Sequence, residues 1–168
     1  MMLHKFTFFK ASILLLLATF ILSCSPKASK SKIGRVFKLN TDIDITLLAE
    51  ADINPDEAGR PSPVFLRMYA LKSDKMFNRF GFIEFFERDE EILGADLITK
   101  RELQRLAPGE SRVDKFMVDE DTRYVAVFAE FFRYSDANYK IIFPVTGNNV
   151  FDTKATVKIS GSNISLVD

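Results

Sequence analysis

Polar and apolar side chains alternate along residues 42–53, the most regular pattern in the chain. Successive side chains of a β-strand point to opposite faces, so a period of two is typical of a strand with one buried face. The pattern therefore predicts a half-buried strand from Asp42 to Ile53. Its apolar face comprises Ile43, Ile45, Leu47, Ala49, Ala51 and Ile53, and its polar face comprises Asp42, Asp44, Thr46, Glu50 and Asp52.

A loop and a second strand are expected next. Asn54–Pro63 contains three prolines and one glycine. Proline removes ladder donors and glycine permits positive φ, so this segment is a loop, longer than a tight hairpin needs. It either connects two strands or recognises a partner, and its prolines would lower the entropy cost of ordering it. Val64–Leu71 is apolar on both faces, which indicates a strand at the centre of a packed sheet.

Apolar residues recur at spacings of three and four between Ser73 and Leu93, which is typical of a short amphipathic helix. Ser73 is the expected N-cap, and Gly94 is the expected residue that ends the helix. The side of the helix that faces the core is expected to carry Phe82, Phe85, Phe86 and Asp89.

Six further strands are predicted, separated by turn-forming residues at spacings near ten. This spacing favours a β-sandwich, and the chain shows no internal repeat and no second domain. The predicted strands are Asp96–Leu103, Arg112–Val118, Tyr124–Phe132, Tyr139–Pro144, Thr153–Ser160 and Asn163–Val167.

The N-terminus has the features of a lipoprotein signal peptide. An apolar run from Ala11 to Leu22 follows basic residues and is too short to cross a bilayer, which needs roughly 20 helical residues. It ends in Ile21-Leu22-Ser23-Cys24, similar to a bacterial lipobox. Cys24 is the only cysteine and has no partner within the chain. An ordinary signal peptide or a short membrane anchor is the alternative.

These features divide the chain into a signal peptide (residues 1–23), a lipidated N-terminus with a flexible tether (24–38) and a β-sandwich domain (39–168). The tether is expected to be flexible because Ser25–Lys32 is small, polar and basic. Several acyl chains hold a protein to a membrane firmly. Ser25, where inner-membrane lipoproteins of enterobacteria often carry aspartate, favours the outer membrane.

Composition argues against catalysis. The only histidine, His4, and the only cysteine, Cys24, are lost or consumed on maturation, and the chain has no tryptophan. This excludes Ser-His-Asp and Cys-His sites, zinc held by histidine or cysteine, and the usual general base at neutral pH. We therefore expect no enzyme, metal or cofactor. Equal numbers of basic and acidic residues, 23 of each, give no reason to expect nucleic-acid binding.

Two segments compete with the loop as candidate sites. The acidic run Glu87–Glu91 could hold a cation or act as a carboxylate pair, but it lacks the spacing of a calcium loop and is expected to be a solvated helix face. The pairs Phe85-Phe86 and Phe131-Phe132 must each divide between two faces if they lie on a strand. Core packing is expected for them, with an exposed contact patch as the alternative.

The chain resembles the TssJ family, the outer-membrane lipoproteins of the type VI secretion system. Tyr139-Lys140 stands where this family often has tryptophan followed by a basic residue. The resemblance spans Asp42 to Leu166 and is carried by several segments in order. They are Asn54-Pro55-Asp56, Pro61-Ser62-Pro63-Val64, Leu66–Leu71, Leu93–Leu97, Leu106–Glu110, Tyr124–Ala129 and Phe132-Arg133.

The resemblance implies a mainly β, transthyretin-like two-sheet sandwich with a short helical insertion. It also implies a partner, the periplasmic C-terminal region of the inner-membrane protein TssM, and a structural tether anchored on the periplasmic face of the outer membrane. A transthyretin-like domain that binds another envelope protein or a small ligand is the alternative. By the resemblance, the partner-binding residues are those of the first long loop: Asn54, Pro55, Asp56, Glu57, Gly59, Arg60 and Pro61.

Overall fold

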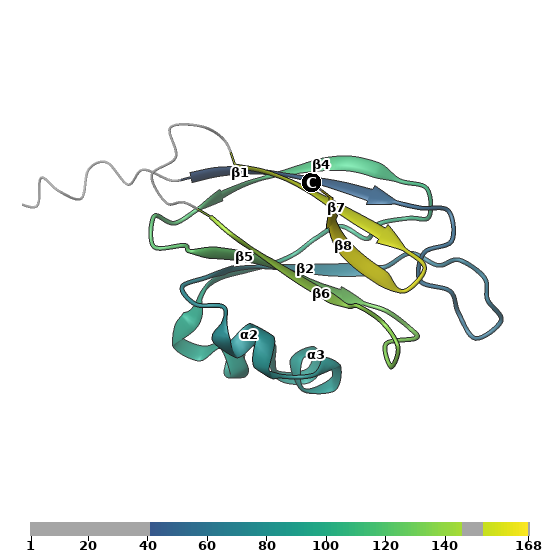
Figure 1. The fold of residues 1–168 in the computed structure, drawn as a ribbon, viewed down its shortest axis with the longest axis horizontal. Helices are drawn as coiled ribbons and strands as arrows, with labels where there is room; N and C mark the ends of the chain where they lie inside the picture. The colour runs from purple at the N-terminus through teal and green to yellow at the C-terminus, as the bar shows by residue number, and fades with distance from the viewer. Residues whose placement is uncertain (1–40, 146–152, 168) are drawn as a thin grey trace, which may run out of the picture. The chain divides into compact units, whose positions relative to one another are not determined.

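The computed structural model describes residues 41–145 and 153–167. The expected signal peptide, Cys24 and the tether lie outside the described residues, as does the turn predicted at Gly147-Asn148-Asn149. Two four-stranded sheets face each other, in the orders β4-β1-β7-β8 and β3-β2-β5-β6 (Figure 1). This confirms the predicted two-sheet β-sandwich, and helices between β2 and β3 form the predicted insertion.

Most predicted elements agree with the structure to within two residues. The strands are β1 (Thr41–Ala49), β2 (Phe65–Leu71), β3 (Leu97–Glu102), β4 (Ser111–Val118), β5 (Tyr124–Glu130), β6 (Lys140–Pro144), β7 (Thr153–Ser160) and β8 (Asn163–Val167). The helices are α2 (Lys75–Arg79), α3 (Phe82–Leu93) and the short 3-10 turn η2 (Gly94–Asp96).

The first strand is shorter than predicted. β1 ends at Ala49, and the chain turns at Ala51 and Asp52, both of which are exposed. The turn forms because the Gly109 amide donates to the Glu50 carbonyl at 3.0 Å, while the Gly161 amide donates to the Asp52 carboxylate at 3.2 Å. The predicted strand from Asp42 to Ile53 was therefore wrong at its C-terminal end, where the chain forms hydrogen bonds to neighbouring turns.

The sheet β3-β2-β5-β6 is the middle of three layers. One face packs on the β4-β1-β7-β8 sheet, and α2 and α3 cover the other (Figure 1). β2 shows the consequence, since Leu66, Met68 and Ala70 enter the core between the sheets while Tyr69 and Leu71 enter the core under the helices. This confirms the predicted central position of β2 and explains why both of its faces are apolar.

Aromatic rings fill the core beneath the helices. Phe85 of α3 makes edge-to-face contacts with Tyr69 at a centroid distance of 5.6 Å and with Phe77 of α2 at 5.0 Å. Such pairs add about 0.5–1.5 kcal/mol each beyond their burial. The neighbouring Phe86 is 44% exposed, so the expectation that Phe86 faces the core with Phe85 was wrong. α3 presents Phe82, Phe85 and Asp89 inward instead.

The helical insertion consists of two helices, with the first beginning later than predicted. Asp74 is the N-cap of α2, whereas Ser73 accepts a hydrogen bond from the Lys75 amide at 3.3 Å. Gly94 ends α3 as predicted, with φ of 48° and its amide bonded to the Glu90 carbonyl.

Tyr139 and Lys140 connect β6 to the helical layer. The Tyr139 ring lies edge-on to Phe82 at 5.1 Å. The Lys140 ammonium donates to the carbonyls of Phe77 and Phe80, both at 2.9 Å, at the end of α2. A cation at a helix C-terminus satisfies carbonyls that have no partner within the helix. Burial lowers the pKa of the Lys140 ammonium. Lys140 therefore fastens α2 to the sheet, and Tyr139 packs against α3.

Four connections meet at one end of the sandwich, to the right in Figure 1. They are the β1–β2 loop (residues 50–64), the β3–β4 loop (103–110), the β5–β6 loop (131–139) and the β7–β8 turn (161–162). We call this the loop end. Thr41 pairs with Val118, whereas Leu48 pairs with Ser111 beside the β3–β4 loop, so the described part of the chain starts at the opposite end. No helix among residues 41–145 and 153–167 is long and apolar enough to cross a membrane.

The two neighbouring phenylalanines of α3 give a matched test of the helical layer. Phe85→Ala should lower the free energy of unfolding by about 4 kcal/mol, because it empties a fully buried aromatic site. Phe86→Ala should lower it by about 1 kcal/mol at most, because the ring is 44% exposed and packs only partly, against Phe82 and Arg67. Urea denaturation measures both values, and equal losses would contradict the assignment of Phe85 to the core and Phe86 to the surface.

Candidate partner-binding site

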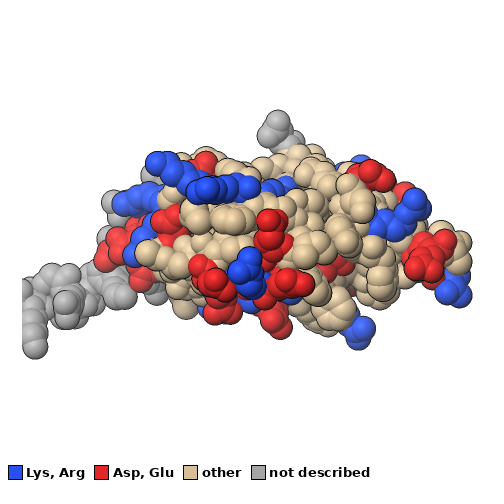
Figure 2. All heavy atoms as spheres, turned by 90° about the horizontal axis from the view of Figure 1, so that it is seen from below, with Lys and Arg blue, Asp and Glu red and all other residues tan. Residues whose placement is uncertain are grey.

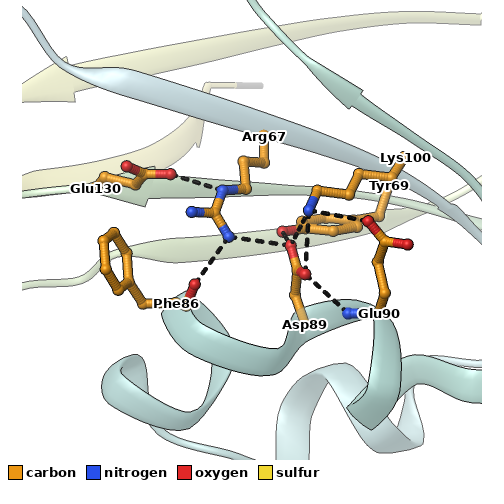
Figure 3. Close-up of polar contacts among 7 residues, drawn as sticks. All are labelled: Arg67, Tyr69, Phe86, Asp89, Glu90, Lys100 and Glu130. Atoms are coloured by element: carbon orange, nitrogen blue, oxygen red, sulfur yellow. Dashed lines mark hydrogen bonds and ion pairs between the residues drawn. The ribbon is translucent and has the colours of Figure 1, made fainter.

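The densest cluster of charged groups lies beneath α3 and includes Asp89, one residue of the acidic run. Asp89 is only 5% exposed, so the prediction of a solvated helix face was wrong at this residue. Three donors from the sheet surround its carboxylate, as Figure 3 shows: Lys100 Nζ at 2.8 Å, Tyr69 OH at 2.7 Å and Arg67 Nη1 at 3.0 Å from Oδ2. The guanidinium of Arg67 also reaches Glu130 of β5 at 2.6 Å.

A break in α3 allows this contact. Arg88 has φ of −140° and ψ of 35°, which is not helical, so the chain kinks immediately before Asp89. The Arg67 guanidinium also donates to the Phe86 carbonyl at 3.1 Å, next to the kink. Arg67 therefore holds both the carboxylate and the distorted turn of the helix.

The electrostatics of the cluster favour one protonation state. Burial raises the pKa of the Asp89 carboxyl, but hydrogen bonds from Lys100, Tyr69 and Arg67 outweigh it and keep that pKa below its ordinary value. Burial, together with the hydrogen bond to Asp89, raises the pKa of the Tyr69 hydroxyl. A carboxylate that already accepts several bonds from fixed donors has little capacity to take a proton from a substrate. This cluster therefore attaches α3 to the sheet.

The β1–β2 loop is built around Asp56. Its Oδ1 accepts hydrogen bonds from the amides of Ala58 and Arg60, both at 2.9 Å, and its Oδ2 contacts the Arg60 guanidinium at 2.8 Å. The Arg60 amide and then the Arg60 side chain hold the pKa of the Asp56 carboxyl below its ordinary value. Gly59 adopts φ of 76°, a left-handed conformation that favours glycine. The tip of the loop is thus a defined turn.

Asn54 fixes the base of the loop. It is 2% exposed and has φ of 46°, which asparagine tolerates better than most residues. Its side-chain amide donates to the Pro63 carbonyl at 2.9 Å, and its Oδ1 accepts from the Phe132 amide at 2.8 Å. One buried side chain therefore closes the β1–β2 loop and joins it to the β5–β6 loop.

The predicted partner-binding residues fall into two groups. Asn54 is buried, and Pro55 and Asp56 are partly buried, so these three shape the loop. The other four are exposed at its tip, where they are available to a partner. They are Glu57, Gly59, Arg60 and Pro61.

Phe132 and Arg133 were not among the predicted partner-binding residues, although an exposed contact patch was the alternative expected for the pair Phe131-Phe132. They line an open hollow of about 430 Å³ together with Asp56, Glu57, Ala58 and Arg60 of the loop. β5 ends at Glu130, so the predicted strand to Phe132 was two residues too long. Phe131 is buried, whereas Phe132 is 66% exposed. The adjacency of Phe131 and Phe132 was a signal that one ring would face outward. The neighbours of that ring could not be predicted, because they come from the β1–β2 loop, over 70 residues earlier in the chain.

The described residues contain no group of three or more histidine, cysteine, aspartate or glutamate side chains placed to hold a metal ion. The described residues form a β-sandwich in which the exposed tip of the β1–β2 loop lies beside the exposed ring of Phe132 at the loop end. Loops positioned by a rigid scaffold commonly carry the binding residues of a protein.

Comparison with known proteins identifies the family. Residues 41–162 match the family model T6SS-SciN, described as type VI secretion lipoprotein (VasD, EvfM, TssJ). The chain therefore belongs to the T6SS-SciN (TssJ) family of type VI secretion lipoproteins. No curated protein sequence matches the chain.

Solved structures share the fold. The T6SS lipoprotein TssJ1 from Pseudomonas aeruginosa has 29% identity and a TM-score of 0.70, covering 76% of this chain and 95% of that one. A chain of a structure called "Type VI membrane complex" has 25% identity and a TM-score of 0.66, with 76% and 98% covered. A chain of "T6SS protein TssM C-terminal domain (869-1107) from EAEC" has 22% identity and a TM-score of 0.64, also with 76% and 98% covered, which shows the fold alone.

Acid should weaken the attachment of α3. The folded-state pKa of Asp89 lies below its value in the unfolded chain, about 3.9, so its contribution to stability is complete well above pH 4 and falls as pH drops through the folded pKa. Asp89→Asn should cost roughly 3 kcal/mol at pH 7, because it leaves buried cations without their counter-ion. The difference in the free energy of unfolding between wild type and Asp89→Asn should become smaller below about pH 4.

Glu91→Gln is the control, because the Glu91 side chain on the same helix is 72% exposed. Urea denaturation between pH 3 and pH 7 should give almost the same free energy of unfolding for Glu91→Gln as for wild type. A difference between wild type and Asp89→Asn that stays constant down to pH 3 would contradict a depressed pKa at Asp89.

Proposed function

We propose that this protein is a non-catalytic tether of the type VI secretion membrane complex. In this proposal Cys24 carries the lipid that anchors the chain to the periplasmic face of the outer membrane. The loop end of the sandwich binds the periplasmic C-terminal region of TssM. The observation that carries the proposal is the ordered β1–β2 loop, which presents exposed residues on a turn held by Asp56 and closed by Asn54.

The arrangement of the strands suits a tether. β1 starts at Thr41, nearest the N-terminal segment, and ends next to the loop that we propose as the binding surface. Nine strand residues span roughly 27 Å at the usual rise per residue. The side of the domain that receives the anchor is therefore separated from the proposed binding surface by the length of the sandwich.

Preorganisation of the loop supports a binding role. A loop that must become ordered on binding loses affinity through the entropy cost, whereas a loop already fixed by internal hydrogen bonds avoids much of that cost. The amides of Ala58 and Arg60 and the guanidinium of Arg60 all bond to Asp56 in the free protein. The partner therefore meets a surface whose shape is already set.

The comparisons support the partner. The chain shares its fold with a chain from a structure called a type VI membrane complex and with a chain from one named for the TssM C-terminal domain. We transfer this association to the present protein as part of the proposal.

A binding titration tests the partner. The mature lipoprotein, purified in detergent, is titrated with the periplasmic C-terminal region of the cognate TssM. We expect saturable binding with a Kd in the micromolar range or below. Changing Asp56, Glu57 and Arg60 together to alanine should weaken it by at least about tenfold, because it removes two exposed side chains and the carboxylate that shapes the turn.

Lys115→Ala is the control for this titration. The Lys115 side chain is 75% exposed on β4, away from the loop end, and its substitution should leave the Kd unchanged. Undetectable binding by the wild-type protein would sink the TssM assignment and favour a different envelope partner. Binding that ignores the triple substitution would keep the partner and move the contact surface.

The anchor is tested separately with Cys24→Ser, because the hydroxyl cannot form the thioether that links the lipid. Without several acyl chains the protein loses nearly all of its membrane affinity. We expect the wild-type chain in the outer-membrane fraction and the variant in the soluble periplasmic fraction after density-gradient separation. A variant that still cofractionates with the outer membrane in cells lacking TssM would contradict anchoring through Cys24.

A further inference from the structure

Phe132 is the most exposed large apolar side chain among the described residues, at 66%. It does not stand alone on a flat face. One side of the hollow at the loop end is Phe132 with Arg133, and the other side is the turn from Asp56 to Arg60. A ring of this size costs free energy when left in water, and its burial by a partner recovers about 25 cal/mol per Å² of apolar area.

The position of Phe132 is fixed by the same residue that closes the binding loop. The backbone amide of Phe132 donates to Asn54 Oδ1 at 2.8 Å. Asn54 is held in turn by two hydrogen bonds, from its side-chain amide to the Pro63 carbonyl and from its backbone amide to the Gly161 carbonyl at 2.8 Å. Phe132 and the β1–β2 loop therefore form one unit in the free protein. Because the backbone at Phe132 is fixed in this way, a partner that binds there does not have to order the loop that carries the ring, which lowers the entropy cost of binding.

Charges in the hollow are either paired internally or free for a partner. Asp56 and Arg60 neutralise each other within the turn. Glu57 and Arg133 make no ion pair with any residue in the part of the chain that the structure describes. The hollow is thus lined by an aromatic ring together with one available acidic group and one available basic group. Figure 2 shows basic and acidic side chains side by side at the right-hand end of the molecule.

We propose that Phe132 is the apolar anchor of the interface with the periplasmic region of TssM, a step that rests on the proposed function. The hollow receives one apolar side chain of TssM, which packs on the Phe132 ring. A basic residue of TssM beside it meets Glu57, and an acidic residue meets Arg133. The contact surface then extends beyond the β1–β2 loop to the β5–β6 loop, and Asn54 acts as a positioning residue for both.

The titration described above tests the anchor through Phe132→Ser in the mature lipoprotein. We expect binding to TssM to weaken by at least about tenfold, whereas Phe132→Leu, which keeps an apolar contact, should lose less than about threefold. Met117→Ser is the matched control, because Met117 is 63% exposed but lies on β4 near the Thr41 end. It should bind as wild type does. Thermal unfolding of each variant should match wild type within a few degrees, because neither side chain is buried.

A double-variant comparison tests the role of Asn54. Asn54→Gly keeps the positive φ and removes both side-chain hydrogen bonds, so it should weaken binding. If Asn54 acts by holding Phe132 in place, part of this loss disappears when the substitution is made in the Phe132→Ser background. Fully additive losses would overturn the positioning role.

The outcomes separate this inference from the proposed function. If wild type binds TssM and the Asp56, Glu57 and Arg60 substitutions weaken binding but Phe132→Ser does not, the anchor is refuted and the tether stands. If Met117→Ser weakens binding as much as Phe132→Ser, the effect is not specific to the hollow and the anchor is again refuted. If wild type does not bind TssM at all, the proposed function fails first.

Discussion

The sheet β3-β2-β5-β6 has water on neither face at its centre, and this two-sided burial constrains the rest of the fold. Val127 of β5 points into the core between the sheets, while its neighbour Phe128 points into the core beneath the helices. Because successive side chains of a strand alternate, a layer between two cores leaves few positions for polar residues. The helices must therefore remain attached, since their loss would expose Phe128 and Tyr69 to water.

Attachment of the helices is achieved with polar contacts at both ends of the insertion. Lys140 holds the carbonyls at the end of α2, and Arg67 and Lys100 hold Asp89 of α3. Buried ion pairs are costly to assemble and very costly to break on one side only. They fix the position of the helices more strictly than apolar packing does, because a helix displaced along the sheet would leave charged groups unpaired. The loops at the ends of the strands lie outside these packed layers, and hydrogen bonds to Asp56 and Asn54 fix the shape of one of them.

Periodicity was enough to predict the framework of this fold but not its polar contacts. Alternation located β7 from Thr153 to Ser160, and the spacing of apolar residues located α3, because both patterns depend only on neighbours in the chain. Asp89 was harder to interpret: the helical period placed it on the inward side, yet its acidic neighbours favoured solvent. Its burial depends on Arg67 and Lys100, which come from strands that local spacing cannot bring together.

The loop end illustrates the same limit. A proline-rich loop between two strands was recognised, and its tip is indeed exposed. The burial of Asn54 was not predictable, because the group that it holds, the Phe132 amide, lies 78 residues further along the chain. The order of the strands supplies that proximity: β2 pairs with β5, so the start of one strand lies beside the end of the other.

The pairing of β1 has a mechanical consequence. β1 lies inside its sheet, hydrogen-bonded to β4 on one side in antiparallel fashion and to β7 on the other in parallel fashion. A pull on the N-terminal end of β1, resisted at the loop end, acts along the axis of this strand. Such a load shears both ladders at once, so many hydrogen bonds share the force, whereas a pull across an edge strand would break them one after another. In the proposed arrangement, with the lipid at Cys24, β1 is therefore the strand best placed to carry tension through the domain.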